Sequence, residues 1–348
     1  MADNPTSDFL AAQKVLKKKF DAHPALNLVN SRLSGLQPRS GWSLINELIQ
    51  NAVDIKATHI KFTYTSNGNL KFQHNARKSP LDTKSIVGLC GVAESTKGLN
   101  TVGFMGIGFK FFTKFFTSVT ISDQKTCFGI SYPIKGNWKD KLKCLYSPKW
   151  ISNGDYPTDV YTTSFYFKDV IPEIASKIDN VFHSIDLEMF PLFVKQGLQE
   201  VIFEDCFNED ANGFVVKGNH IRKSKSVQIS EGDNSKNFLV LEESITASKS
   251  GKEFVVNKRS LDPELAVDAE LTRTVSMVIE VVEDSERWIP IPGSTGELFC
   301  LVPLPDSKFP FKIGLDADWF MDSERTELDR DVHAVNWHSE MITPTLPV

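Results

Sequence analysis

The sequence predicts an α+β fold: a layered α/β sandwich with a mixed, mostly antiparallel sheet, followed by a second α+β domain. In the first half, an amphipathic helix is followed by a hairpin, a long connection, a short helix and a run of strands. Strands and helices do not alternate there as they do in a doubly wound sheet. The phosphate-loop pattern Gly-x4-Gly-Lys-Ser/Thr is also absent. We therefore expect two domains, residues 1–172 and residues 173–348.

The composition is that of an ordinary globular protein. Of the 348 residues, 41% are hydrophobic and 24% are charged. The formal net charge of -5 gives no general attraction to nucleic acid, so a role on nucleic acid would have to come through partners. No signal-peptide pattern opens the chain, and no apolar run approaches the roughly 20 residues of a membrane span. We expect a cytoplasmic protein with no membrane contact.

The cysteines argue against a zinc site or a disulfide framework. They lie far apart, without a paired spacing, at Cys90, Cys127, Cys144, Cys206 and Cys300. Reduced thiols fit a cytoplasmic setting. The closing Thr-Pro-Thr-Leu-Pro-Val is typical of a linker, so the chain is expected to be the front part of a longer protein.

The elements expected before the long connection follow from hydrophobic periodicity and turn residues. Helical spacing predicts two helices near the start and a third around residues 44–54, after a break at residues 38–41. Asn67-Gly68 is a strong hairpin turn between two alternating runs. The two early helices and the two strands are expected at residues 8–21, 26–33, 58–65 and 70–74.

The same reasoning places the remaining elements. Short helices are expected at residues 82–90 and 109–116, and residues 171–193 are expected to be mostly helical. Residues 230–236 are polar and are expected to form a loop, and a short helix is expected around Trp337. Strands are expected at residues 118–122, 127–132, 143–146, 161–167, 197–203, 273–283, 296–303 and 311–315, and further strands or loops within residues 215–241.

Three polar residues form a row on the helix around residues 44–54. Glu47 and Asn51 are four residues apart, so they stack on one face, and Asp54 continues the row. A carboxylate can act as a general base, and a carboxamide oxygen can bind a hard cation such as magnesium. The alternative is a surface helix with ordinary polar side chains.

A glycine-rich stretch could bind an anion. Gly103, Gly106 and Gly108 precede a predicted helix, so backbone N–H groups and the positive end of the helix dipole would converge there. Lys97 and Lys110 would add mobile positive charge for phosphate oxygens. The alternative is a flexible loop before an incidental helix.

Taken together, these motifs resemble the GHKL ATPases. The resemblance is carried by Glu47-x3-Asn51-x2-Asp54, Asn75 at a strand end, Ser95-Thr96-Lys97 and Gly103-x2-Gly106-x-Gly108-x-Lys110. Within that superfamily the chain looks most like the sacsin-type branch, and it also resembles the N-terminal ATPase region of the ninety-kilodalton heat-shock chaperones. The resemblance covers residues 41–167 and, more loosely, residues 299–337.

The resemblance implies a Bergerat-type fold that binds ATP with Mg²⁺ beneath a lid formed by residues 77–108. Glu47 would be the catalytic base and Asn51 the magnesium ligand. Arg325, in the second domain, would contact the γ-phosphate as a further catalytic residue, with Arg330 as second choice; a local salt bridge explains Arg325 equally well. The nucleotide would be bound by Asn51, Asp54, His74, Asn75, Ser95, Thr96, Lys97, Gly103, Phe104, Met105, Gly106, Ile107, Gly108, Phe109, Lys110, Thr162 and Thr163.

One motif departs from the family. Most members have Asp-x-Gly-x-Gly, whose carboxylate accepts a hydrogen bond from the adenine amino group. This chain has His74-Asn75-Ala76-Arg77-Lys78 in its place. A histidine can accept that hydrogen bond only through an unprotonated ring nitrogen, so the departure puts adenine selectivity in doubt.

The expected function is magnesium-dependent ATP hydrolysis that drives an open and closed cycle on a protein partner or client, with a nucleotide-dependent homodimer. The alternative is a nucleotide-binding scaffold or switch with little or no hydrolysis. A histidine kinase would need a phospho-acceptor helix before the motif helix, where only about forty residues are present and His23 precedes Pro24.

Overall fold

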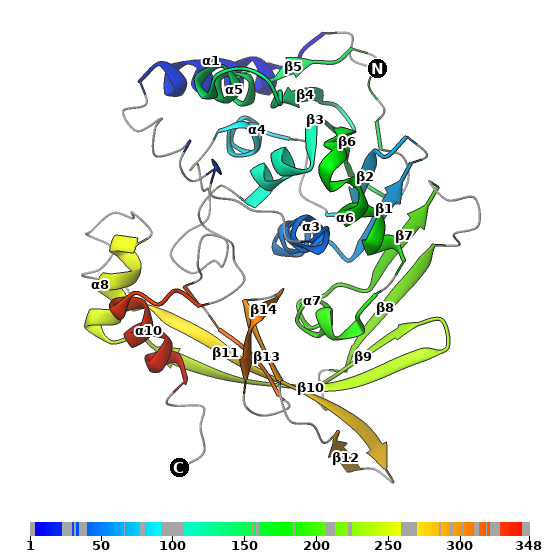
Figure 1. Ribbon diagram of the computed structural model, residues 1–348, viewed down its shortest axis with the longest axis vertical. Helices are drawn as coiled ribbons and strands as arrows, with labels where there is room; N and C mark the ends of the chain where they lie inside the picture. Colours follow the sequence, from blue (N-terminus) through cyan, green and yellow to red (C-terminus); the bar gives the residue numbers. More distant parts are fainter. Residues whose placement is uncertain are drawn as a thin grey trace. The chain divides into compact units, whose positions relative to one another are not determined.

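The computed structural model divides into two compact units, each described here by itself (Figure 1). The first unit comprises Met1–Thr96, Met105–Asp186 and Gln196–Lys217, and the second comprises Lys97–Phe104, Leu187–Lys195 and Gly218–Val348. The predicted domain boundary at residue 172 stays a prediction. The structure describes residues 4–22, 30, 33–34, 40–65, 67–76, 81–91, 108–152, 154, 156–157, 160–183, 185–206, 213–221, 225–258, 270–284, 287–291, 296–300, 302–309, 313–317, 319–320 and 328–342.

The first unit is built on a mixed, mostly antiparallel sheet, as predicted. Its strand order is β7-β1-β2-β6-β3-β4-β5, and only the β1–β7 pair of this series is parallel. Strand β8 (Phe214–Ile221) begins in this unit, antiparallel to β7. The series consists of β1 (His59–Tyr64), β2 (Leu70–His74), β3 (Phe116–Asp123), β4 (Cys127–Ser131), β5 (Lys149–Trp150), β6 (Thr163–Val170) and β7 (Glu200–Asp205).

One face of this sheet is a ladder of aromatic rings. Strands β1, β2 and β7 alternate buried and partly exposed residues, as strand geometry requires. The Phe62 ring stacks on Phe72 at 4.9 Å and on Phe203 at 5.1 Å between centroids. Aromatic cross-strand pairs of this kind contribute about 0.5–1.5 kcal/mol each beyond the area they bury. The face is therefore tightly packed, and the helices lie against it.

Helix α3 (Trp42–Asp54) is the predicted motif helix. Its apolar side chains are buried, and its Trp42 ring meets Phe203 edge-on at 5.9 Å. The helix ends where Lys56 adopts a left-handed conformation with φ 68°. The backbone N–H of Ala57 then bonds the Ala52 carbonyl, which turns the chain into β1.

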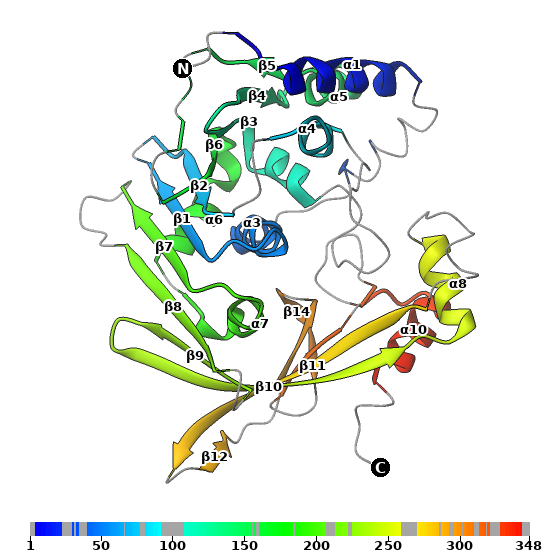
Figure 2. The same cartoon turned by 180° about the vertical axis from the view of Figure 1, so that it is seen from behind.

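Helices α1 (Ser7–Ala22) and α4 (Thr83–Cys90) also belong to this unit (Figure 2). Helix α1 confirms the predicted helix at 8–21 and packs against α4. The Phe9 ring of α1 also contacts Phe128 at 5.7 Å and Trp150 at 5.3 Å. The predicted helix at 26–33 lies almost wholly outside the described residues. Shorter helical pieces follow β6: η2 (Pro172–Ile174), α6 (Ala175–Asp179) and η3 (Asn180–Phe182).

Two local predictions were wrong, and one predicted helix is of a different type. Residues 143–146 were expected as a strand but lie in helix α5 (Trp138–Leu145) and the residue after it, because Asn137 caps the helix through a 3.0 Å bond from the Asp140 N–H. The helix expected at 109–116 is a 3-10 helix, η1 (Gly108–Lys114), because Phe116 already pairs in β3. Residues 230–236 form a tight hairpin, since Gly232 adopts φ 55°.

The second unit contains mostly antiparallel strands in the order β14-β13-β15-β11-β10-β9, with β12 paired to β11. Only β13 and β15 pair in parallel among these strands. The sequence analysis did not foresee α8, β12 or β14. The strands and helices are β9 (Ser226–Glu231), β10 (Asn234–Thr246), β11 (Thr272–Asp284), β12 (Arg287–Pro290), β13 (Gly296–Cys300), β14 (Val302–Phe309), β15 (Gly314–Asp316), η4 (Leu187–Met189), α7 (Pro191–Lys195), α8 (Lys249–Lys258) and α10 (Val332–Ile342).

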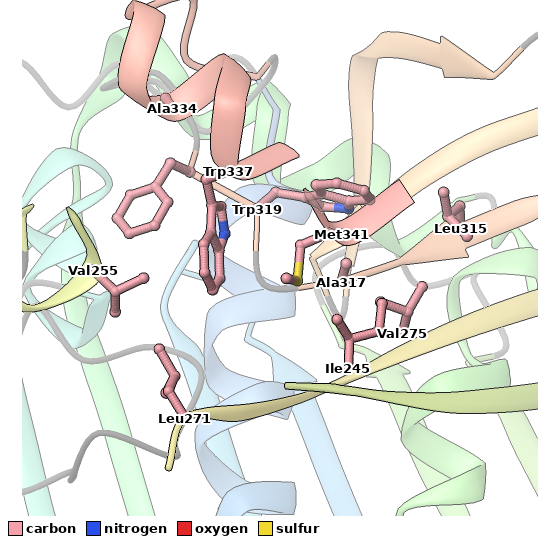
Figure 3. Packing of buried hydrophobic residues seen from close by; sticks show 11 residues of the cluster. Ile245, Val255, Leu271, Val275, Leu315, Ala317, Trp319, Ala334, Trp337 and Met341 are labelled. Carbon is pink, nitrogen blue, oxygen red and sulfur yellow. The ribbon is translucent and has the colours of Figure 1, made fainter. Parts of the chain in front are cut away.

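The core of the second unit packs helix α10 onto the sheet (Figure 3). Trp337 and Met341 of α10 are buried with Trp319, which precedes the helix in the chain. His338 is also buried there, and its Nε2 accepts a 3.1 Å bond from the Phe320 N–H. Within the described part of the chain, no helix is both long enough and apolar enough to cross a membrane.

Replacing Gly41 with alanine should destabilise the first unit by about 1–3 kcal/mol, because the new methyl group overpacks a filled site. Its Cβ would overlap the Lys177 carbonyl of α6 and lie 2.7 Å from Val181 Cγ2. Denaturant unfolding of the full chain measures the loss. Gly129→Ala is the control, since its Cβ would meet Ile151 Cδ1 at an ordinary 3.4 Å. Equal stabilities of the two variants would contradict this account of Gly41.

Candidate functional site

The polar residues of α3 form one continuous strip along the helix. Successive residues turn by about 100°, so the strip occupies an arc of about 140° and the buried aliphatic residues fill the rest of the circumference. In angular order, the strip consists of Asn46, Gln50, Asp54, Glu47 and Asn51. Glu47, Asn51 and Asp54 are half-buried, as expected for a polar row beside a cavity.

Two members of the strip are unsatisfied inside the protein. Asn46 is 8% exposed and Gln50 is 2% exposed. Neither Asn46 Oδ1 nor Gln50 Nε2 has a hydrogen-bond partner in the part of the chain that the structure describes. Buried polar atoms nearly always have partners, so these two indicate that water or a ligand reaches the helix. Neither residue was predicted from the sequence, although their i, i+4 spacing is next to that of Glu47 and Asn51.

His74 ends β2 on the buried face of the sheet. It is 3% exposed and pairs with Ile60 on one side and Thr163 on the other. Its Nδ1 accepts a 3.3 Å bond from the Ala76 N–H. Burial lowers the pKa of His74 from 6.5 to about 4, so the ring is neutral at pH 7.

Asn75 and Thr162 hold this strand end in place. The Asn75 carboxamide oxygen accepts bonds from the backbone N–H groups of Thr58 and His59, each at 2.9 Å. Thr162 donates its hydroxyl to the Ala76 carbonyl at 2.7 Å and its N–H to the His74 carbonyl at 2.9 Å. Both side chains therefore shape the backbone around His74, which is a role that the sequence alone did not suggest.

The start of η1 lies close to the same strand end. The Phe165 ring contacts His74 at 6.0 Å and Phe109 at 5.6 Å, so one ring lies between the strand end and η1. Helix η1 also packs against α3. Helix α3 and Phe109 of η1 thus lie on the buried face of the sheet, which is the face on which the His74 side chain lies.

Lys110 is held inside this layer rather than displayed to solvent. It is 1% exposed, and its Nζ donates a 2.7 Å bond to the Gly88 carbonyl in the last turn of α4. A cation is favourable at that end of a helix. Burial also raises the pKa of nearby Cys90 to about 12, against the opposing effect of the Lys110 charge. The sequence analysis expected a mobile side chain at Lys110; its role toward phosphate stays a prediction.

Several predicted site residues lie outside the described residues, so their roles also stay predictions. Of the proposed lid, α4 is described, and the Leu81 N–H before it bonds the Asp123 carboxylate. Gly108 is described only as the first residue of η1. The predicted residues outside are Ser95, Thr96, Lys97, Gly103, Phe104, Met105, Gly106, Ile107 and Arg325.

A second group of side chains offers metal ligands. Three potential ligand atoms lie within 4.8 Å of one another, one each from Asp179, His183 and Asp205. His183 Nε2 is 3.2 Å from Oδ2 of Asp179, four residues earlier in the chain. Burial, together with the charges of the two aspartates, raises the pKa of Tyr64 to about 12. Asp179 and His183 lie four residues apart, but Asp205 comes from strand β7, so sequence spacing alone did not reveal the group.

Comparison with protein-family models finds no match, and comparison with curated proteins finds no matching sequence. Among solved structures, the chain is similar to a crystal structure of the 43K ATPase domain of Thermus thermophilus gyrase B in complex with an aminocoumarin. The identity is 16% and the TM-score 0.35, over 76% of this chain and 61% of that chain. The chain thus spans less than two thirds of that protein's length.

Acid should destabilise the protein through His74. The pKa of His74 is lower when folded than when unfolded, so its contribution is present above pH 6.5 and is lost as pH falls toward 4. The loss amounts to about 3 kcal/mol. In His74→Gln, the free energy of unfolding should fall less over this range, as measured by urea unfolding. His333→Gln, at an exposed position, is the control. An unchanged pH slope in His74→Gln would contradict the prediction.

Proposed function

We propose that the chain is a magnesium-dependent ATPase module whose nucleotide binds against the polar strip of α3. The observation that supports this most is the strip itself: two carboxylates and three carboxamides on one helix, with Asn46 Oδ1 and Gln50 Nε2 buried and unsatisfied. A helix buried by its aliphatic face gains nothing from such atoms unless water or a ligand meets them.

The strip has the donor set that magnesium and hydrolysis require. The Asn51 carboxamide offers a neutral oxygen to a hard cation, and magnesium would supply charge neutralisation of the phosphates when bound. Glu47 lies four residues earlier on the same side of the helix, where a carboxylate can take a proton from an attacking water. The residues present thus fit a magnesium–nucleotide complex.

The remaining roles rest on sequence motifs. Gly103, Gly106 and Gly108 would bind the phosphates with Lys97, residues 77–108 would close over the nucleotide, and Arg325 would contact the γ-phosphate. Thr162, Asn75 and His74 form a rigid strand end beside which the base would lie. The module would act in the cytoplasm on a protein partner or client, as a nucleotide-dependent homodimer.

A binding module with little hydrolysis is the second candidate. The departure of His74-Asn75-Ala76 from the family's adenine motif is the observation that favours it. The two candidates differ in turnover and not in affinity, so the variants below separate them.

Glu47→Gln should retain nucleotide affinity and lose turnover by about a hundredfold or more, because the amide cannot act as a base. Affinity is measured by calorimetry and turnover by phosphate release, both with magnesium. Glu173→Gln, an exposed carboxylate of the same unit, should change neither. Wild-type turnover in Glu47→Gln would remove Glu47 as the base, and absent turnover in the wild type would favour the second candidate.

Asn51→Ala should lose the magnesium-dependent part of the affinity for ATP, because a methyl group offers the cation no oxygen. The measurement is a titration with ATP in magnesium and again in a chelator. Gln73→Ala is the matched control, because Gln73 alternates with His74 and lies on the other face of β2. If magnesium still strengthens binding in Asn51→Ala as it does in the wild type, Asn51 is not the ligand.

A further inference from the structure

His74 presents a hydrogen-bond donor, not an acceptor, at its second ring nitrogen. The Ala76 N–H points at Nδ1 over 3.3 Å, so Nδ1 carries a lone pair. A neutral imidazole has a single N–H, which must then be on Nε2. This assignment follows from the hydrogen bond and is the opposite of what an aspartate at this position would offer, since a carboxylate only accepts.

The Nε2–H has no acceptor in the part of the chain that the structure describes. The ring is 3% exposed, and its recorded neighbours are the rings of Phe72 and Phe165, at 5.6 and 6.0 Å. An acceptor on a ligand could pair with this donor.

The polar groups around His74 offer no substitute for the missing carboxylate. Asp123 lies in the same cross-strand row, paired with Thr163, which pairs with His74. Its Oδ1 already accepts from the N–H groups of Lys125 and Thr126 at 2.8 and 2.7 Å, and its Oδ2 accepts from Leu81. The Asn75 carboxamide oxygen likewise accepts two N–H groups.

We propose that Nε2–H of His74 donates a hydrogen bond to a purine base. The site would therefore prefer a nucleotide with a 6-oxopurine base, guanine or hypoxanthine, over one with adenine. The proposal rests on the proposed function for placing the base beside His74, and it changes which base that site selects. The C6 oxygen of a 6-oxopurine accepts a hydrogen bond from Nε2–H. In adenine the group at C6 is an amino donor that Nε2–H cannot pair with, and the acceptor lies one ring position away, at N1.

The test compares inosine triphosphate with ATP, which differ only in the groups at C6 and N1 of the base. Calorimetric titration of the full wild-type chain with magnesium should show inosine triphosphate binding about tenfold more tightly, as one matched buried hydrogen bond implies. His74→Asp should reverse the preference, and His74→Asn, whose amide can donate or accept, should abolish it. Gln73→Asp, on the other face of β2, should leave it unchanged.

The outcomes separate the two proposals. Equal or tighter binding of ATP by the wild type would overturn the base preference and leave the nucleotide site intact. Failure of both triphosphates to bind would overturn the proposed function together with the preference. If His74→Asp does not fold, the affinities of the wild type and of His74→Asn for inosine triphosphate and ATP still test the base preference.

Discussion

The packing of α3 against the aromatic face of the first sheet is the constraint on which the candidate site depends. Burying the six aliphatic residues Leu44, Ile45, Leu48, Ile49, Ala52 and Val53 fixes the rotation of the helix. Once the rotation is fixed, the polar strip from Asn46 to Asn51 has one direction in which to face. The site is therefore a consequence of core packing, in which each buried leucine, isoleucine or valine contributes roughly 1.5–3 kcal/mol.

The register of the strands that carry the aromatic rings determines which side chains lie on the face of the sheet covered by α3. Because side chains alternate along a strand, the register that places Phe72 beside Phe62 also places His74 beside Ile60 on the same face. A slip of one residue would move His74 to the other face of the sheet. The strand end is further fixed by Asn75 and Thr162, whose side chains bond the backbone on either side of it. The orientation of the imidazole is thereby part of the fold.

Unsatisfied buried groups mark where the protein departs from ordinary core design. Asn46 and Gln50 each leave a buried polar atom without a partner among the described residues. By contrast, Lys110 and Asp123, which are also buried, are bonded to backbone groups. Residue type and sequence spacing do not distinguish these two kinds of buried polar residue.

The sequence by itself determined the elements whose signals are local. The periodicity of residues 44–54 and the Asn67-Gly68 turn each predicted the observed element, because helical spacing and turn chemistry act within a few residues. Residues 143–146 have a short apolar pattern that fits a helix or a strand, and the burial of Leu142 and Leu145 within the first unit, together with the local Asn137 cap, favours α5. The tautomer of His74 and the hydrogen bond from Lys110 to the Gly88 carbonyl likewise depend on tertiary structure. Both depend on where a backbone group lies in space, and composition and spacing do not encode that position.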